Sequence, residues 1–292
     1  MTTDATSTDA AAIASILERY KTGSLSAPVT VMQLLIETED FAVTKAAVVG
    51  IEELERLVES NAAGCERIAA MLRADVDSAR PARTVEEGIA FCERLFDWSV
   101  QQSEEASVAL YSLGNPQLLE QATAEIVALL RKWGAVTKDT VLLDIGCGIG
   151  RLLTALAPEI RSATGIDVST EMVKAAQKRC APYRNLTVIK GDGNGLGDLP
   201  DATFEIAIAV DSFPYLRQSG YPLVERFFAE SSRVLKPGGQ LVILNYSYSD
   251  DHEKDAREVR TLADVNGMKV VTAGERPFEL WDATAFRAIK IQ

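Results

Sequence analysis

A glycine-rich turn follows a short apolar run, Val141–Ile145, near the middle of the chain. The turn consists of Gly146, Cys147, Gly148, Ile149 and Gly150. Glycine lets the backbone bend sharply and come close to a ligand, and the start of the following helix adds free N–H donors. Asp144 stands just before the turn and could receive an ammonium group or a loop N–H. The G-x-G-x-G spacing differs from the G-x-G-x-x-G of nucleotide pyrophosphate sites, and a turn without a ligand is the alternative.

Two further carboxylates follow the next apolar runs. Asp167 ends the run at 163–167, and a carboxylate at the end of a second strand can accept both hydroxyls of a ribose. Met172 then faces the expected place of an adenine, and Asp192, beside Gly193, could accept an amino hydrogen of that base. The alternatives are a helix cap for Asp167, core packing for Met172 and a solvated turn for Asp192.

Short apolar runs must position these residues. From residue 140 onward they alternate with helical stretches: VLLDI (141–145), ATGID (163–167), LTVIK (186–190), FEIAIAV (204–210), QLVILNYS (240–247), MKVVT (268–272) and FRAIKI (286–291). Near-continuous apolar strands separated by helices predict a mostly parallel sheet that is covered on both faces. The fold class is therefore doubly wound α/β, in which ligands bind at the carboxyl ends of the strands.

The first 110 residues show only helical periodicity. Apolar residues recur at helical steps in two stripes: Ile51, Leu54, Val58, Cys65, Ile68 and Leu72, then Ile89, Cys92, Phe96 and Val100. Residues 1–110 carry 19 acidic and 9 basic side chains, whereas residues 111–292 carry 23 and 21. We predict an α-helical N-terminal region, 1–110, before an α/β domain, 111–292. The region could be an acceptor lid, a dimerisation surface or a structural brace.

From about residue 110 onward the chain resembles the class I S-adenosylmethionine-dependent methyltransferases. Four passages in the expected order carry the resemblance: VLLDIGCGIGRLL, GIDVSTEMVKAA, the GDG after the third strand, and SRVLKPGGQLVIL. The resemblance implies a Rossmann-like methyltransferase fold with a seven-stranded sheet whose last strand runs antiparallel. It also implies S-adenosyl-L-methionine as the cofactor.

The resemblance assigns expected roles to the residues described above. The glycine loop would cradle the methionine moiety, Asp144 would lie near its ammonium group, Asp167 would hold the ribose and Asp192 the adenine. Tyr111, ahead of the first helix of the domain, would close over the cofactor, unless it only packs between helices. The predicted cofactor-binding residues are Tyr111, Asp144, Gly146, Cys147, Gly148, Gly150, Asp167, Val168, Met172, Asp192, Gly193 and Asp211.

Methyl transfer requires an aligned acceptor, and a general base if the acceptor is a hydroxyl or an ammonium group. Tyr215, Tyr246 and Tyr248 follow strands four and five, where they could wall an acceptor pocket and attract a cationic acceptor. His252 has an ordinary pKa near neutrality but also fits a solvated helix start. The predicted catalytic residues are Tyr215, Tyr246 and His252. Asp211 fits a structural or cofactor-side acid better than a base.

The composition excludes several other classes of protein. Of the 292 residues 47% are hydrophobic and 25% charged, which is typical of a globular chain, and no apolar run reaches membrane-spanning length. A net charge of -12 disfavours nucleic acid as a partner. One histidine excludes a multi-histidine metal site, and four scattered cysteines predict reduced, buried thiols. The segment MTTDATSTDA lacks the basic and apolar parts of a signal peptide, so we expect the cytoplasm.

These observations predict an S-adenosylmethionine-dependent methyltransferase that acts on a small-molecule acceptor, with no nucleic-acid, membrane or metal partner. A homodimer through the N-terminal helices is a further prediction. The alternative function is a non-catalytic cofactor-binding or regulatory protein that keeps the fold. A nicotinamide-dependent dehydrogenase conflicts with the G-x-G-x-G spacing and with the passage RVLKPGG.

Overall fold

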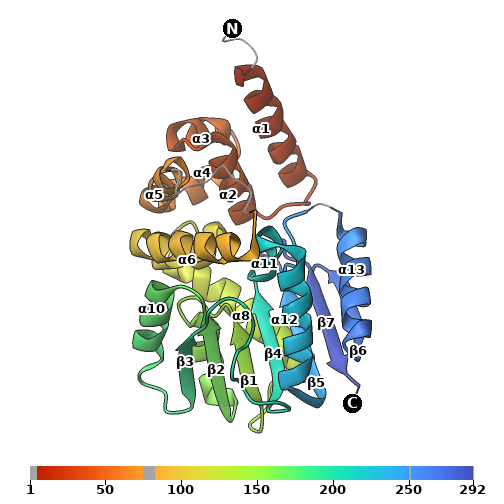
Figure 1. Ribbon diagram of the computed structural model, residues 1–292. Coiled ribbons are helices and arrows are strands. Elements are labelled where there is room, and N and C mark those ends of the chain that lie inside the picture. Colours follow the sequence, from red (N-terminus) through yellow and green to blue (C-terminus); the bar gives the residue numbers. More distant parts are fainter. Residues whose placement is uncertain (1–4, 75–82, 250, 292) are drawn as a thin grey trace. The chain divides into compact units, whose positions relative to one another are not determined.

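The computed structural model describes residues 5–74, 83–249 and 251–291 (Figure 1). The described residues divide into two compact units that interleave along the chain. The first unit draws on Met1–Ser78, Ser99–Ala122 and Phe278–Asp282, and the second on Ala79–Trp98, Thr123–Pro277 and Ala283–Gln292. Two helices, α6 (Val85–Gln102) and α8 (Pro116–Lys132), therefore contribute residues to both units.

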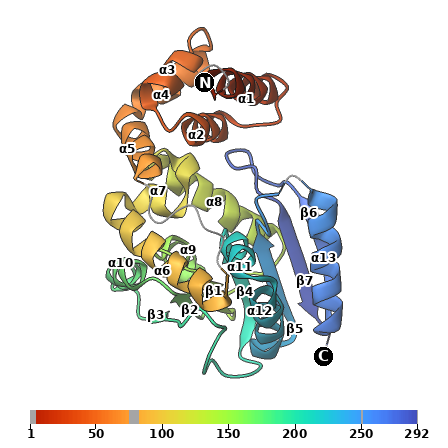
Figure 2. The same cartoon turned by 45° about the horizontal axis from the view of Figure 1, so that its top comes forward.

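The second unit is built on one seven-stranded sheet (Figures 1 and 2). Its strands are β1 (Val141–Ile145), β2 (Ser162–Asp167), β3 (Leu186–Lys190), β4 (Phe204–Val210), β5 (Leu235–Leu244), β6 (Met268–Glu275) and β7 (Ala285–Lys290). They lie in the order β3-β2-β1-β4-β5-β7-β6, and β7 runs antiparallel to both of its neighbours while the other pairs are parallel. The predicted fold class is confirmed, including the antiparallel last strand.

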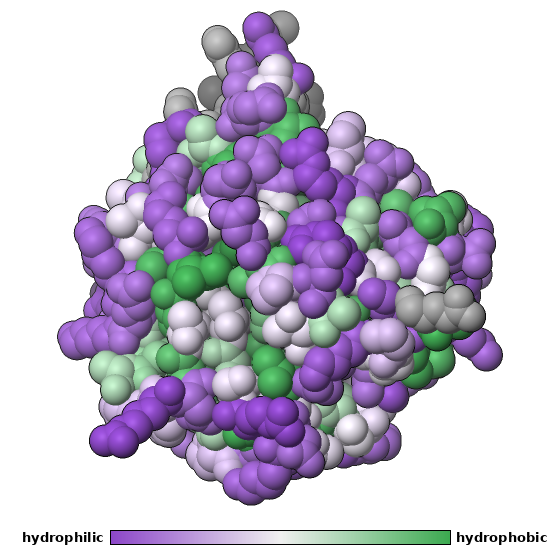
Figure 3. Space-filling view, turned by 60° about the horizontal axis from the view of Figure 1, so that its bottom comes forward, coloured by the Kyte–Doolittle hydropathy of each residue, from purple (hydrophilic) through white to green (hydrophobic). Residues whose placement is uncertain are grey.

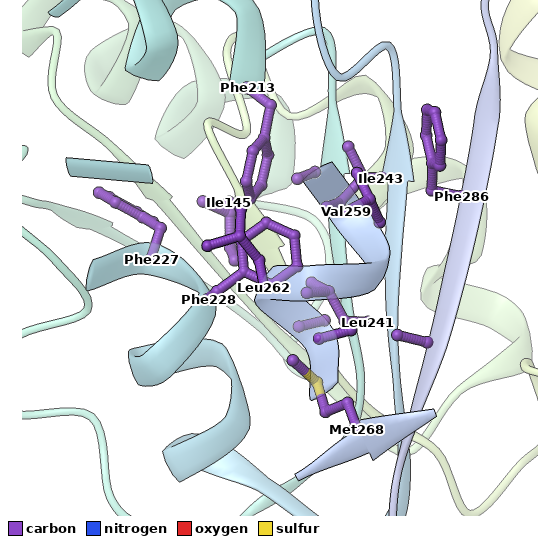
Figure 4. Packing of buried hydrophobic residues seen from close by; sticks show 14 of the residues in the cluster. Ile145, Phe213, Phe227, Phe228, Leu241, Ile243, Val259, Leu262, Met268 and Phe286 are labelled. Atoms are coloured by element: carbon purple, nitrogen blue, oxygen red, sulfur yellow. The ribbon is translucent and has the colours of Figure 1, made fainter. Parts of the chain in front are cut away.

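Side-chain alternation along the central strands builds the core on one face of the sheet. Alternate residues of the central strands point into one buried cluster: Leu143 and Ile145 of β1, Ala207 and Ala209 of β4, and Leu241 and Ile243 of β5. The cluster also takes side chains from α12 (Tyr221–Val234) and α13 (His252–Val265). Figure 4 shows Phe228 of α12 and Leu262 of α13 packed together with Ile145 and Ile243 of the sheet. On other strands, α9 (Arg151–Leu156) packs on β2 and α10 (Thr170–Cys180) on β2 and β3. The core thus fixes the strand ends that carry the candidate site.

Several element boundaries differ from the sequence prediction, and two of them have a clear local cause. Strand β5 spans Leu235–Leu244 instead of 240–247, because Asn245 has a left-handed backbone with φ 63° that ends the extended run. The stripe from Ile51 to Leu72 belongs to two helices, α4 (Glu52–Ser60) and α5 (Ala62–Arg73), which are separated at Asn61. Helix α8 begins at Pro116, and Asn115 caps it, since the Asn115 Oδ1 accepts a hydrogen bond from the backbone N–H of Gln117 at 2.8 Å.

The first unit is helical. Besides its parts of α6 and α8 it contains α1 (Ala5–Lys21), α2 (Ala27–Thr38), α3 (Phe41–Ala47), α4, α5, α7 (Glu104–Val108) and a short 3-10 turn at Leu110–Ser112. Within this unit Tyr111 stacks on Trp281 with ring centroids 5.5 Å apart, and Ser26 Oγ donates to the Leu280 carbonyl at 2.8 Å. The segment around Trp281 is thereby held to the helices of the first unit.

The surface is mainly polar. On the face shown in Figure 3, charged and polar residues predominate and hydrophobic residues form small, separate patches. Among the described residues, no helix combines the length and the apolar character that crossing a bilayer requires. All four cysteines are buried and free, as predicted.

Candidate functional site

The glycine loop bends back over the end of β2. Gly146 has φ 72° and donates its N–H to the Ile166 carbonyl at 2.8 Å, while Gly148 and Gly150 have φ 51° and 74°. A side chain at Gly146 would not fit, because its Cβ would lie 2.7 Å from the Cβ of Ser212. The loop therefore needs glycine for its backbone conformation and for its close approach to the segment after β4.

Asp167, the last residue of β2, joins the glycine loop to the start of α10. Its Oδ2 accepts the backbone N–H of Gly148 at 2.8 Å, and its Oδ1 accepts the N–H of Ser169 at 2.9 Å. Burial raises the pKa of Asp167, and these backbone hydrogen bonds partly oppose the shift. The backbone N–H of Val168 also bonds to this carboxylate, so about one of its four acceptor positions stays free for a ligand.

Asp144 lies on β1 just before the loop and is 2% exposed. Burial raises its pKa to about 7, Asp167 adds to that shift, and the positive charge of Arg151 opposes it. Arg151 begins α9, and its Nη1 donates to the Thr123 hydroxyl at 3.0 Å. A cationic ligand beside Asp144 would favour the ionised carboxylate, as Arg151 already does in part.

Helix α6 reaches the carboxyl ends of the strands, a feature that the sequence prediction missed. Asp97 Oδ1 accepts hydrogen bonds from Ser169 Oγ at 2.6 Å and from the backbone N–H of Glu171 at 2.9 Å. Glu93, one turn earlier, pairs with Lys190 at the end of β3 at 2.8 Å. Glu93 and Asp97 follow Ile89 by four and eight residues, so they lie on the same side of the helix as Ile89. This spacing is the sequence feature that could have predicted their contacts with the sheet.

The turn after β3 combines an exposed acid with a packed glycine. Asp192 is exposed, and its Oδ1 accepts the N–H of Asn194 at 2.8 Å, which is a turn hydrogen bond. Gly193 has φ 78°, and an added Cβ would lie 2.6 Å from Ile89 of α6 and 3.1 Å from Val168. Met172 is buried, with 1% exposed, and donates its N–H to the capping hydroxyl of Ser169. The adenine-side roles of these residues stay predictions.

Acidic and aromatic residues meet where β4 and β5 end. Asp211 and Asn245 both have left-handed backbones, with φ 60° and 63°, and Asn245 Nδ2 donates to Asp211 Oδ1 at 3.1 Å. Tyr215 and Tyr248 lie edge to face, with ring centroids 6.0 Å apart. The Tyr248 hydroxyl bonds both to Asp211 and to Tyr215. The structure thus brings Asp211, predicted on the cofactor side, together with the predicted catalytic Tyr215.

Tyr246 has different surroundings. It is completely buried in the core cluster, where its ring packs beside Phe213, Phe228 and Phe286, and the Arg217 guanidinium lies 4.7 Å from its ring centroid. Its position favours core packing rather than contact with an acceptor.

His252 begins α13 near the opposite edge of the sheet. Its Nε2 lies 2.5 Å from Nη2 of Arg276, the residue that follows the edge strand β6. Strand β6 is separated from β4 by β5 and β7, which places it about 14 Å away at the usual spacing of ~4.8 Å per strand. The contact found for His252 is thus with Arg276, and its role as a base stays a prediction.

Two further predicted residues have packing partners of their own. Cys147 is buried, and its Sγ would lie 2.8 Å from a Cβ added to Gly165 of β2. The side chain of Cys147 therefore packs directly on the backbone of β2. Tyr111 belongs to the first unit, where it is 3% exposed and stacked on Trp281. Its predicted role over the cofactor stays a prediction.

Comparisons with known proteins match the sheet-bearing part of the chain. Residues 143–243 match the family model described as a methyltransferase domain. The chain is 30% identical over 137 residues to the 2-methyl-6-phytyl-1,4-hydroquinone methyltransferase of Synechocystis, covering 46% of this chain and 41% of that one. It is 31% identical over 113 residues to the demethylmenaquinone methyltransferase of Tropheryma whipplei, covering 39% and 44%. The match thus spans less than half the length of each curated relative.

A solved structure extends the comparison of folds. Phosphoethanolamine N-methyltransferase 1 of Haemonchus contortus superposes with a TM-score of 0.54 at 16% identity, covering 71% of this chain and 50% of that one. The sheet order, the glycine loop and the family match agree with one another. Residues 143–243 thus carry a methyltransferase-domain sequence, on a sheet whose strand order is the one that the resemblance to class I S-adenosylmethionine-dependent methyltransferases implies.

Proposed function

We propose that this protein binds S-adenosylmethionine at the carboxyl ends of β1, β2 and β3 and transfers its methyl group to a small-molecule acceptor. The observation that carries the proposal is the Asp167 carboxylate. Backbone N–H groups of Gly148, Val168 and Ser169 hold it, and about one of its four acceptor positions remains for a ligand hydroxyl. A ribose presents hydroxyl donors that a carboxylate at the end of the second strand can accept.

The other polar groups of the site fit the same cofactor. Asp144 is a buried carboxylate whose pKa of about 7 reflects incomplete charge compensation, so an amino-acid ammonium group would stabilise its ionised form. Ser212 Oγ is buried without a hydrogen-bond partner among the described residues, and Ser212 lies against Gly146. A ligand that brings its own polar atoms to this loop would satisfy the hydroxyl.

The residues of the chain then act mainly by binding and orientation. When bound, S-adenosylmethionine supplies an electrophilic methyl group, so the protein has to align an acceptor with it. Asp167 and Asp144 would fix the ribose and the amino-acid ends, and Tyr215, Tyr248 and Asp211 would border the acceptor. The lid or dimerisation role predicted for residues 1–110 is a separate proposal, and the part of α6 in the second unit supports only a structural link to α10.

Titration calorimetry of Asp167 variants tests this proposal. We expect S-adenosylmethionine to bind the wild-type chain at micromolar strength, and Asp167→Ala to weaken binding by about ten- to a hundredfold, because a charge-assisted hydrogen bond to the ligand is lost. Asp198→Ala is the matched control, since Asp198 is an exposed turn residue outside the site. Equal affinity in Asp167→Ala and the wild type would overturn the assignment.

Turnover separates the enzyme from the alternative of a non-catalytic binding protein. Wild-type chain incubated with S-adenosylmethionine and a panel of small acceptors should release S-adenosylhomocysteine in amounts that depend on the acceptor. Binding of the cofactor without release for any acceptor would favour the non-catalytic alternative.

A further inference from the structure

Three aromatic rings and one carboxylate form a corner at the ends of β4 and β5. We call Phe96, Tyr215, Tyr248 and Asp211 the aromatic corner. Phe96 of α6 lies edge to face with Tyr215, with centroids 4.8 Å apart and planes at 74°, and Tyr215 meets Tyr248 at 87°. Rings at right angles make adjacent walls rather than a flat stack. The corner is accessible, since 55% of Tyr248 is exposed and Phe96 and Tyr215 are half-buried.

The backbone that holds the carboxylate has an uncommon, left-handed conformation. Asp211 and Asn245 follow neighbouring strands, both adopt the left-handed conformation, and the Asn245 amide donates to Asp211 Oδ1. The Asn245 Oδ1 in turn accepts the backbone N–H of Thr284 at 3.3 Å, which ties the pair to the segment before β7. Left-handed residues other than glycine cost free energy and cluster at sites that use a fixed geometry.

The corner is also electronegative. Burial of its hydroxyl end and the nearby Asp211 carboxylate raise the pKa of Tyr248, although more than half of that residue is exposed. The same two causes raise the pKa of Tyr215, so both rings stay neutral at physiological pH. Aromatic faces beside a carboxylate suit a cation, which a ring quadrupole attracts.

We propose that the aromatic corner binds a cationic ammonium group carried by the acceptor substrate. This inference rests on the proposed function, because it names the acceptor's chemical class at the same site. The corner acts as a recognition element, and the atom of the acceptor that receives the methyl group is left open. Phe96 forms one wall of the corner and lies on α6, outside the passages that resemble other methyltransferases. We therefore expect Phe96 to contribute to the choice of acceptor.

The probe for this site is choline, and its uncharged isostere is the control ligand. In the isostere a tert-butyl group replaces the trimethylammonium group, so the two ligands have the same shape and differ in charge. Calorimetry on the full chain saturated with S-adenosylhomocysteine should give a dissociation constant for choline about tenfold lower than for the isostere, as expected for a partly desolvated cation–π site. Equal affinities, or no detectable choline binding, would overturn the proposal.

Single-residue variants then test which side chains give the preference for choline over its uncharged isostere. Tyr248→Leu should bring the affinity ratio close to one, whereas Tyr248→Phe should keep most of it, because the ring face remains. Asp211→Asn should reduce the ratio about threefold while leaving the backbone in place, since asparagine tolerates the left-handed conformation. Tyr221→Leu is the matched control, as Tyr221 is 44% exposed on α12. A ratio lowered equally by Tyr221→Leu contradicts the assignment to the aromatic corner.

The same samples distinguish the two proposals. A titration with S-adenosylmethionine that fails, beside an intact preference for choline, would refute the proposed function and leave a cation site. A normal S-adenosylmethionine titration without any cation preference would refute the aromatic corner alone.

Discussion

Removal of the Asp97 carboxylate should weaken both the fold and the cofactor site. Asp97 Oδ1 accepts two hydrogen bonds at the start of α10, from Ser169 Oγ at 2.6 Å and from the Glu171 N–H at 2.9 Å. Hydrogen bonds to charged groups contribute about 1.5–3 kcal/mol each, and a negative charge at a helix N-terminus about 0.3–1 kcal/mol. Because Asp97 is only half-buried, we expect Asp97→Ala to lower the free energy of unfolding by about 2–3 kcal/mol.

The same change should reach the cofactor through Ser169. The backbone N–H of Ser169 holds Asp167 Oδ1, so a loosened Ser169 leaves the ribose-binding carboxylate less ordered. We expect the affinity for S-adenosylmethionine to fall about five- to tenfold, which is ~1–1.4 kcal/mol. Asp97→Asn keeps an acceptor oxygen and should lose only about 1 kcal/mol of stability.

Urea unfolding and calorimetry measure the two effects. Glu93→Ala is the matched control, because Glu93 lies one turn away on α6 and its ion pair with Lys190 is largely exposed. Such a pair contributes about 0–1 kcal/mol, and its loss should leave cofactor affinity unchanged. The reasoning is refuted if Asp97→Ala and Glu93→Ala have the same small effect on both quantities.

Three further changes test other parts of the site. Gly146→Ala should cost about 2–4 kcal/mol of stability and most of the cofactor affinity, because its φ is 72° and the added Cβ would meet Ser212. The control is Gly134→Ala, at φ 64° in open space, which should cost only about 1 kcal/mol in the same unfolding and binding assays. Tyr246→Phe should retain turnover and most of the stability, since the ring keeps its place in the core, and Tyr246→Ala should lose about 3–5 kcal/mol in urea unfolding. A large loss of turnover in Tyr246→Phe would contradict this. Asp144 has a folded-state pKa of about 7, above the ordinary 3.8, so its contribution is complete below about pH 4 and is lost as the pH rises through 7. Asp144→Asn should flatten that decline when unfolding is compared at about pH 5 and pH 8, and an unchanged decline would count against burial as its cause.

The strands and the glycine loop could be predicted from the sequence because local pattern alone determines them. Val141–Ile145 is a continuous apolar run that ends at a glycine, and the structure has β1 over the same residues. Asp167 ends its strand as predicted. The carboxyl ends of neighbouring parallel strands lie at the same edge of the sheet. The sequence therefore predicts that Asp144, the glycine loop and Asp167 lie close together.

Other features depend on contacts between distant segments. Strict alternation along β5 would place residue 245 with Leu241 and Ile243 in the core, but the left-handed Asn245 shifts the pattern, so Tyr246 is buried and Tyr248 is exposed. No local signal distinguishes these two tyrosines. The Asp97 contact with α10 was equally hidden, because it joins residues 72 positions apart.

The central claim is that the carboxyl ends of β1, β2 and β3 bind S-adenosylmethionine. The most direct measurement is a calorimetric titration of the wild-type chain with S-adenosylmethionine and, separately, with NADH. We predict saturable binding of S-adenosylmethionine at a stoichiometry of about one per chain and no binding of NADH. Binding of NADH without binding of S-adenosylmethionine would contradict the claim.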